Sequence, residues 1–438
     1  MKLPDHVLCC LHRLEAAGYA AYVVGGCVRD ACLGLKPHDY DICTAALPEE
    51  TEAVFAGSRL VLAGKKHGTV GVIINGEVVE ITTFRTEGSY RDNRHPEWVE
   101  FVPDIEKDLA RRDYTINAMA WSPMRGFADP FGGREDLKKG ILRAVGRAEA
   151  RFQEDSLRIL RGVRFAVRFG LAVEPETEKA MQTQAPLMDN LARERVFDEL
   201  CNLLPLVTAG DLIRFAPVLC QVVPELAPLV GYDQKNHHHI YDLFTHTALV
   251  VQHCPADLTL RWAALLHDTG KPATMTLGED GQAHYYGHAA AGAELAGIVL
   301  RRLKAPTALR EQVMLLIEKH MTLPQPEKKF LRRWLGKLGW ETMNRLLALQ
   351  QADTAATGTD HHAECSQFLK IQAILSEIQE ENACLSLRNL ALNGHDLMAL
   401  GYQGKAIGQA LNHLLNLVLE DQCENTREAL LAALTQEE

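Results

Sequence analysis

The sequence predicts an α+β protein in which a head of mixed strands and helices precedes an all-α remainder. In the head, two β-rich runs, 70–74 and 78–84, are joined by Asn75 and Gly76, the residue pair that best suits a type I′ hairpin turn. From about Ala148 onward, apolar residues recur at roughly 3.6-residue spacing nearly to the end of the chain. Clear examples of this helical spacing are residues 194–204 and 406–419.

Length and composition are those of an ordinary globular protein. The 438 residues suggest about three domains, and a content of 47% hydrophobic and 24% charged residues excludes a largely disordered or collagen-like chain. No stretch approaches the ~18 uninterrupted apolar residues of a membrane span, and residues 1–6 lack the charged-then-apolar order of a signal peptide. We therefore expect a cytoplasmic protein with no membrane partner. The sequence carries no signal for an oligomeric state.

The spacing of the cysteines and the net charge exclude further classes of protein. The 11 cysteines form no plausible disulfide framework and no CxxC metal ladder, so we expect reduced, mostly buried thiols. A net charge of -11 argues against a nucleic-acid coat protein, because phosphate binding needs a basic surface. Positive charge is nevertheless concentrated locally, since residues 147–168 hold six arginines against three acids.

The first candidate site is a glycine turn in the head. A buried strand over residues 21–24 runs into Gly25 and Gly26 and then into a helix that carries Arg29. Two glycines permit a tight turn and let backbone N–H groups approach a phosphate near the positive end of a helix dipole. A turn of this kind alone is more often structural than functional.

The second candidate site is a pair of carboxylates. Asp39 and Asp41 have the period of a strand, so both are expected to project from one face. Like charges so placed repel one another unless a cation lies between them. A pair that holds two Mg²⁺ ions, with Glu80 on the adjacent hairpin as a third candidate, is what two-metal phosphoryl transfer requires. The alternative is a solvated turn after Pro37.

Five segments in this order resemble the motifs of the bacterial class of tRNA nucleotidyltransferases, the CCA-adding enzymes, a family that also contains bacterial poly(A) polymerases. They are Gly25-Gly26-Cys27-Val28-Arg29-Asp30, Asp39-Tyr40-Asp41-Ile42-Cys43-Thr44, Lys66-His67-Gly68-Thr69-Val70, Thr83-Phe84-Arg85 and Arg111-Arg112-Asp113-Tyr114-Thr115-Ile116-Asn117-Ala118. The resemblance covers residues 1–205 and implies a nucleotidyltransferase fold for the head. Each motif is modest alone, but their combination is specific.

The resemblance implies a role for each matching residue. The nucleotide triphosphate would be contacted by the glycine turn and two arginines, namely Gly25, Gly26, Arg29 and Arg112. Asp39 and Asp41 would hold Mg²⁺. Arginine suits the phosphate role because it pairs well with phosphate oxygens and keeps its charge. The implied substrates are CTP, ATP and the 3′ end of tRNA.

Residues 154–165 are predicted to form one helix, with polar side chains every three residues that would read the base. These are Asp155, Arg158, Arg161 and Arg164. A carboxylate only accepts hydrogen bonds and a guanidinium only donates them. An Asp155–Arg158 pair therefore fits the edge of cytosine or adenine and rejects uracil and guanine. In the resembled family the matching residues act in this way, with Arg161 and Arg164 also at the nucleotide. The alternative is an arginine-rich helix that follows RNA phosphates.

Two further segments resemble parts of that family. The polar, turn-rich residues 85–96 resemble the flexible loop that lets the site change from C to A, although His95 stands where the family commonly has arginine. Residues 402–408 resemble the Gly-rich start of the family's last helices, where Lys405 could meet phosphate. An ordinary helix start explains that segment equally well.

A histidine-rich segment, 231–357, is predicted to be a separate module. Four of its side chains resemble the metal site of the HD phosphohydrolase superfamily, which takes Mn²⁺, Ni²⁺ or Mg²⁺; they are His246, His267, Asp268 and Asp353. His288 and His320 fall where some HD enzymes bind a second metal. Such a site would hydrolyse a phosphomonoester or cyclic phosphodiester. We expect His237–His239 and His284 to be ordinary packed or surface residues.

The predicted organisation has four parts. They are a catalytic nucleotidyltransferase head (1–147), a helical neck that recognises base and RNA (148–228), a metal-dependent HD domain (229–357) and a helical tail that binds tRNA (358–438). The predicted function is template-independent addition of CCA to tRNA. Two alternatives stay open: A addition or poly(A) synthesis within the same family, or an HD phosphohydrolase whose head binds nucleotide as a regulator.

Overall fold

The computed structural model describes residues 1–88, 98–235, 240–279, 281–358, 362–381, 384–420 and 422–435. These residues divide into two units. The first comprises 1–207 and 214–224, and the second comprises 208–213 and 225–438. The finer division into four domains stays a prediction.

The head of the first unit is built on a seven-stranded mixed sheet with the order β3-β4-β5-β2-β1-β8-β9. Its strands are β1 (Ala21–Val24), β2 (Asp41–Thr44), β3 (Arg59–Val61), β4 (Thr69–Ile74), β5 (Glu77–Thr83), β8 (Ala120–Ser122) and β9 (Gly126–Ala128). The β2–β5 pair is parallel and the others are antiparallel. β4 and β5 form the predicted hairpin, in which Asn75 (φ 54°) and Gly76 (φ 87°) both have the positive φ of a type I′ turn. The hairpin prediction is confirmed.

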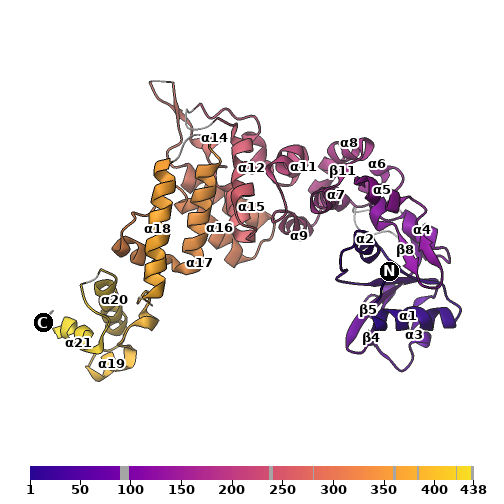
Figure 1. Ribbon diagram of the computed structural model, residues 1–438, viewed down its shortest axis with the longest axis horizontal. Helices are drawn as coiled ribbons and strands as arrows, with labels where there is room; N and C mark the ends of the chain where they lie inside the picture. The colour runs from indigo at the N-terminus through magenta and orange to yellow at the C-terminus, as the bar shows by residue number, and fades with distance from the viewer. Residues whose placement is uncertain are drawn as a thin grey trace. The chain divides into compact units, whose positions relative to one another are not determined.

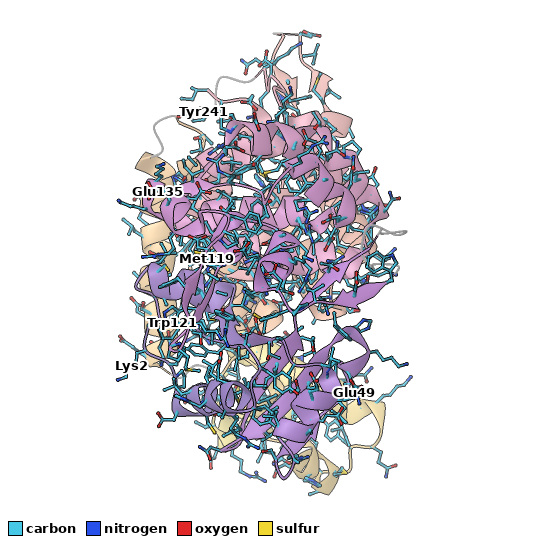
Figure 2. All side chains as sticks on the ribbon, turned by 90° about the vertical axis from the view of Figure 1, so that its right-hand side faces the viewer. Lys2, Glu49, Met119, Trp121, Glu135 and Tyr241 are labelled. Carbon is cyan, nitrogen blue, oxygen red and sulfur yellow. The ribbon has the colours of Figure 1, made fainter. Side chains whose placement is uncertain are left out.

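Each face of this sheet has its own core. Ala21, Val23 and Ile42 belong to the face covered by the helices α1 (Asp5–Ala16), α2 (Gly26–Cys32) and α3 (Pro48–Val54). Tyr22 and Val24 belong to the opposite face, together with Leu109 of α4 (Ile105–Ala110). This alternation follows from the pleat of a strand. Figure 1 shows α1 and α3 beside β4 and β5, and Figure 2 shows Lys2 and Glu49 on the outside of the head.

The remaining elements of the first unit are small strands and helices. The strand pairs are β6 (Arg85–Glu87) with β7 (Val99–Phe101) and β10 (Ile141–Leu142) with β11 (Ala172–Val173). The helices are the 3₁₀ turns Lys65–His67 and Thr115–Asn117, α5 (Gly133–Lys139), α6 (Ala148–Glu154), α7 (Leu157–Phe169), α8 (Pro175–Thr183), the 3₁₀ turn Ala185–Asn190, α9 (Arg193–Leu203) and α11 (Ala216–Val222). α9 confirms the helix predicted near 194–204.

The single helix predicted over 154–165 is wrong. α6 ends before Asp155, whose backbone is extended (φ -142°, ψ 102°), and α7 begins at Leu157. The carboxylate of Asp155 accepts the backbone N–H of Leu157 at 3.1 Å. A short acidic side chain that bonds to the backbone two residues ahead stabilises the start of a new helix rather than the interior of one.

The second unit is helical apart from one short strand pair among its described residues, β12 (Thr276–Leu277) with β13 (Ala283–His284). Its helices are α12 (Leu243–His253), α13 (Leu258–Leu266), α14 (Lys271–Thr274), α15 (His288–Arg302), α16 (Thr307–Lys319), α17 (Lys328–Ala355), α18 (His362–Glu380), α19 (Gly394–Ala399), α20 (Lys405–Leu419) and α21 (Arg427–Thr435), with a 3₁₀ turn at Leu387–Asn389. The 3₁₀ turn Pro224–Leu229 begins in the first unit and continues into the second. α10 (Ala209–Arg214) extends across the division between the units. α20 confirms the helix predicted over 406–419. None of the described helices is long and apolar enough to cross a membrane.

Candidate active site

Two acidic side chains lie next to each other on adjacent strands of the head sheet. β2 and β5 run parallel, with Ile42 opposite Ile81, and both isoleucines are buried in the core beneath α1. Because successive side chains of a strand point to opposite faces, Asp41 and Glu80 project together from the other face. Asp39 is not part of the strand as predicted, because β2 begins at Asp41.

The pKa of Asp41 is shifted by its burial and by the charged groups around it. Desolvation by the surrounding protein raises this pKa, Glu80 and Asp39 raise it further, and Arg112 lowers it. All three acids remain exposed to solvent. Carboxylate oxygens that repel one another are the ligands that a hard divalent cation prefers. The residues therefore fit the predicted Mg²⁺ site.

The glycine turn lies beside this acidic group. β1 pairs with β2 so that Val24 faces Asp41, and Gly25 follows with φ 75° and ψ -126°. A Cβ atom at Gly25 would lie 3.0 Å from a guanidinium nitrogen of Arg112, closer than most side chains approach, so any larger residue, strained already by the positive φ, would push against that arginine. The structure thus brings Gly25, Arg112 and the carboxylates together.

Arg112 is held in place by a buried acid. Asp108 is 1% exposed and pairs with Arg111 at 2.8 Å and with Arg112 at 3.3 Å. Burial raises the pKa of Asp108, but the two arginines lower it by more, so that it stays below its usual range. A buried carboxylate that is ionised fixes the direction of the guanidinium groups around it.

Arg29, predicted at the triphosphate, is buried and fully engaged within the protein. It donates to Asp30 (2.6 and 2.8 Å) and to the side-chain oxygen of Asn117 (2.6 Å). Its guanidinium carbon lies 4.4 Å from the ring centroid of Phe169 on α7. In this structure Arg29 links the glycine helix α2 to α7.

The two predicted base-reading residues, Asp155 and Arg158, do not form an ion pair with each other. Asp155 is bound by both terminal nitrogens of Arg195, at 2.7 and 3.3 Å. Arg158 donates to Glu154 (2.7 Å) and to the backbone oxygen of Arg111 (3.0 Å). Each member is oriented by its own partner, and both lie close to the break between α6 and α7.

The two remaining arginines of α7 are also held by acids. Arg161 donates to Asp113 (2.9 Å) and Arg164 to Glu199 on α9 (2.6 Å). Asp113 also accepts from Asn117 at 3.0 Å, so it connects Arg161 with Arg29. Burial raises the pKa of Asp113, but Arg161 and Asn117 lower it by more, to about 2.

The supporting residues Arg195 and Glu199 were not identified from the sequence. They lie 40 and 35 residues from the side chains that they hold. The only signal is the charged run Arg193-Glu194-Arg195 and Asp198-Glu199 at the start of a helix, which is equally typical of a solvated face. Most of the predicted flexible loop, with His95, lies outside the described residues.

A second cluster lies in the second unit, where the predicted HD residues converge. Nε2 of His246 is 3.0 Å from Asp353 and 3.5 Å from Asp268, and Nε2 of His267 is 3.2 Å from Asp268. The other carboxylate oxygen of Asp268 faces Nε2 of His288 at 3.5 Å. His320 is 4.0 Å from the same oxygen. Asp268 thus lies between two groups of ligands.

The orientations of the four histidines suit metal binding. In each ring Nδ1 lies against a backbone carbonyl, which can only accept, so Nδ1 donates there and Nε2 faces the cluster, where it can bind a metal once it is deprotonated. The bonds run from His246 to Ala356 (3.3 Å), His267 to Ala264 (2.8 Å), His288 to Tyr285 (2.7 Å) and His320 to Ile317 (2.6 Å). The residues therefore fit a divalent metal.

The charges of this cluster are strongly coupled. Burial lowers the pKa of His267, but Asp268 and Asp353 raise it by more, to about 10. Burial lowers the pKa of His320 to about 4, and the neighbouring His267 adds to the effect. Lys271, which we did not single out in the sequence, lies 2.8 Å from Asp268 and is also buried. His237–His239 lie outside the described residues, and His284 stacks on Tyr286.

Three segments match known families. Residues 21–143 match the poly A polymerase head domain, residues 170–206 match the probable RNA and SrmB-binding site of polymerase A, and residues 289–434 match the putative tRNA nucleotidyltransferase domain 2. An HD family is not among these matches.

The curated relatives that match this chain share one activity in their names. The CCA-adding enzyme of Geobacillus stearothermophilus is 32% identical over 99% of this chain and 97% of its own length. That of Streptococcus pneumoniae is 50% identical over 54% of this chain and 58% of its own length. The crystal structure of the Bacillus stearothermophilus CCA-adding enzyme with CTP is 30% identical, covers 100% of this chain and 98% of that chain, and has a TM-score of 0.71. The chain belongs to the family of CCA-adding enzymes, the bacterial class of tRNA nucleotidyltransferases.

Proposed function

We propose that this protein adds C, C and A to the 3′ end of tRNA from CTP and ATP, without a nucleic-acid template. The observation that carries the proposal is the adjacent placement of Asp41, Glu80, Gly25 and Arg112 in a chain that is similar to a CCA-adding enzyme over almost its whole length. That similarity favours CCA addition over A addition alone or poly(A) synthesis. A head that only bound nucleotide as a regulator would not need the three neighbouring acids Asp39, Asp41 and Glu80.

Nucleotidyltransferases of this kind need divalent metal ions, and we assign Mg²⁺ to Asp39 and Asp41, with Glu80 beside them. Two such ions would activate the attacking 3′-hydroxyl and neutralise charge on the triphosphate. Arg112 would bind phosphate oxygens as a cation of fixed orientation, because its guanidinium group forms an ion pair with the buried carboxylate of Asp108. Gly25 leaves the space in which that arginine lies.

Base selection would be carried out by Asp155 and Arg158. Cytosine and adenine both present an amino donor beside a ring nitrogen acceptor, which a carboxylate and a guanidinium complement. Arg195 and Glu154 hold these two groups in the ligand-free arrangement. Rejection of UTP and GTP would come from opposed donors and acceptors, the stronger source of discrimination.

The experiment is an addition assay on tRNA that lacks CCA, with each nucleoside triphosphate alone and in mixtures and products resolved to one nucleotide. We expect C, C and A to be added in order and addition to stop there. Asp39→Ala should abolish addition. Addition of A alone to tRNA that ends in CC, or a long A tract, would replace the proposal with one of its family alternatives.

A second function is favoured by the histidine cluster. We propose that it binds Mn²⁺, Ni²⁺ or Mg²⁺ and hydrolyses a phosphomonoester or a cyclic phosphodiester. A bound divalent ion supplies activation of water and neutralisation of phosphate charge. Four histidines whose Nε2 atoms face the buried carboxylate of Asp268 support metal binding.

The test of this second function compares His267→Ala with His284→Ala, a histidine of the same unit outside the cluster. We expect the first variant to lose phosphatase activity and to keep CCA addition, and the second to keep both. Unchanged phosphatase activity in His267→Ala would rule out the cluster as the hydrolytic site.

A further inference from the structure

A pocket of about 400 Å³ lies between the end of α16 and the first half of α17. Its lining includes the aromatic side chains Phe330 and Trp334 and the cations Lys319, Arg333 and Lys337, and none of the described residues that line it is acidic. The volume is that of a site for one small ligand, on the scale of a nucleotide.

The pocket follows from the local sequence. Residues 328–337 hold five basic residues and no acid in a chain of net charge -11. Phe330, Arg333, Trp334 and Lys337 recur at spacings of three and four, so they share one face of the helix. The helix breaks immediately afterwards at Gly339, with φ 74° and ψ 165°, and this short helical segment ends beside the pocket.

The aromatic residues are held while the cations remain available. Trp334 is partly buried and packs on the core formed by α17 and α18, so it keeps a fixed orientation without being enclosed. Lys337 is exposed. Arg333 pairs with Glu420 and Lys319 with Glu318, but these side chains are 40% and 39% exposed, and ion pairs in solvent contribute little and exchange readily.

We propose that this pocket binds one unstacked nucleotide of the RNA substrate, with its base on Trp334 and its phosphates at Lys319, Arg333 and Lys337. A positively charged groove combined with an aromatic platform is the arrangement that binds single-stranded nucleotides without reading their sequence. The inference rests on the proposed function, which names tRNA as the RNA. It places an RNA contact in α17, outside the predicted tail.

The test measures the Kd of the full-length protein for tRNA lacking CCA across a series of KCl concentrations. Lys319→Glu/Lys337→Glu should raise the Kd at least about tenfold and reduce the slope of log Kd against log salt by roughly one to two. Trp334→Ala should weaken binding roughly five- to a hundredfold, and Trp334→Phe should retain most of the affinity. The control is Lys370→Glu, on the exposed surface of α18, which should bind like the wild type.

The outcomes separate this inference from the function on which it rests. The KM for tRNA should rise in step with the Kd in the double lysine variant, because the pocket binds the RNA substrate. The wild-type protein could bind tRNA but add no nucleotide, while the double lysine variant binds tRNA more weakly. This result would support the pocket as an RNA-binding site and contradict CCA addition as the function. If the wild type adds CCA and the double variant binds with unchanged Kd and salt slope, the pocket assignment is overturned.

Discussion

Arg195 on α9 binds both carboxylate oxygens of Asp155 from 40 residues away, at 2.7 and 3.3 Å. Asp155 itself lies at the break between α6 and α7, where helix geometry does not fix its direction. The side chain that we propose as a reader of the base is thus oriented by a long-range ion pair. This arrangement gives Arg195 a positioning role.

We predict that Arg195→Met lowers kcat/KM for both CTP and ATP about tenfold, the effect of losing a charge-assisted hydrogen bond. Incorporation of UMP or GMP should rise, because Asp155 can then rotate. The Kd for tRNA should be unchanged. The control is Arg193→Met on the same helix, and equal kinetics in the two variants would show that Arg195 has no such role.

The glycine turn gives a prediction with an internal control. Gly25 and Gly34 both have positive φ, near 75° and 72°, but only Gly25 lies against Arg112. Alanine at either position should cost about 1 kcal/mol or more of stability through backbone strain. Gly25→Ala should in addition displace Arg112 and raise KM for nucleotides.

Thermal unfolding and addition kinetics measured on both variants separate these effects. We expect Gly34→Ala to retain the nucleotide KM of the wild type. A Gly25→Ala enzyme with the same nucleotide KM would contradict the placement of Arg112 at the triphosphate.

Asp113 predicts how stability depends on pH. Its pKa in the folded protein, about 2, is below the ordinary value of 3.8. Ionised Asp113 therefore adds about 2 kcal/mol to the free energy of unfolding above pH 3.8, and this contribution is lost as the pH falls towards 2. Asp113→Asn should lower the free energy of unfolding at neutral pH, and the variant should lose less stability than the wild type between pH 3.8 and pH 2. Urea unfolding between pH 2 and 7 measures it, with exposed Asp198→Asn as the control; identical pH curves for wild type and Asp113→Asn would contradict the prediction.

The histidine cluster predicts a metal stoichiometry. Because Asp268 offers one oxygen to His246 and His267 and the other to His288 and His320, we expect the cluster to hold two ions per chain after incubation with Mn²⁺ and desalting, counted in an Asp39→Ala/Asp41→Ala background so that the metal site of the head does not contribute. His320→Ala should retain one. Elemental analysis gives the number, and two ions in His320→Ala would show that His320 is not a ligand.

Local chemistry decided which parts of the fold could be predicted. Asn75 and Gly76 specify their turn by their own φ preferences, so the hairpin and the neighbouring position of Glu80 followed from the sequence. The HD residues were predicted to converge because of their resemblance to a known metal site. In both cases the decisive information lies within the motif itself.

Long-range pairing decided what could not be predicted. The helix break at Asp155 depends on whether its carboxylate binds a backbone N–H or solvent, and helical periodicity does not distinguish these. The partners Arg195 and Glu199 have no periodic or motif signal of their own. Arg29 was expected at phosphate, and its burial against Asn117 and Phe169 depends on the packing of α7.

The central claim, that the carboxylates of the head carry out nucleotide addition, is tested most directly by single-turnover CMP addition to tRNA that lacks CCA. We predict that Asp41→Asn lowers this rate at least about a thousandfold, since a ligand of the catalytic metals is lost. The Kd for tRNA should stay unchanged, and Glu77→Gln on the same sheet should react like the wild type. A rate in Asp41→Asn within about tenfold of the wild type would contradict the account.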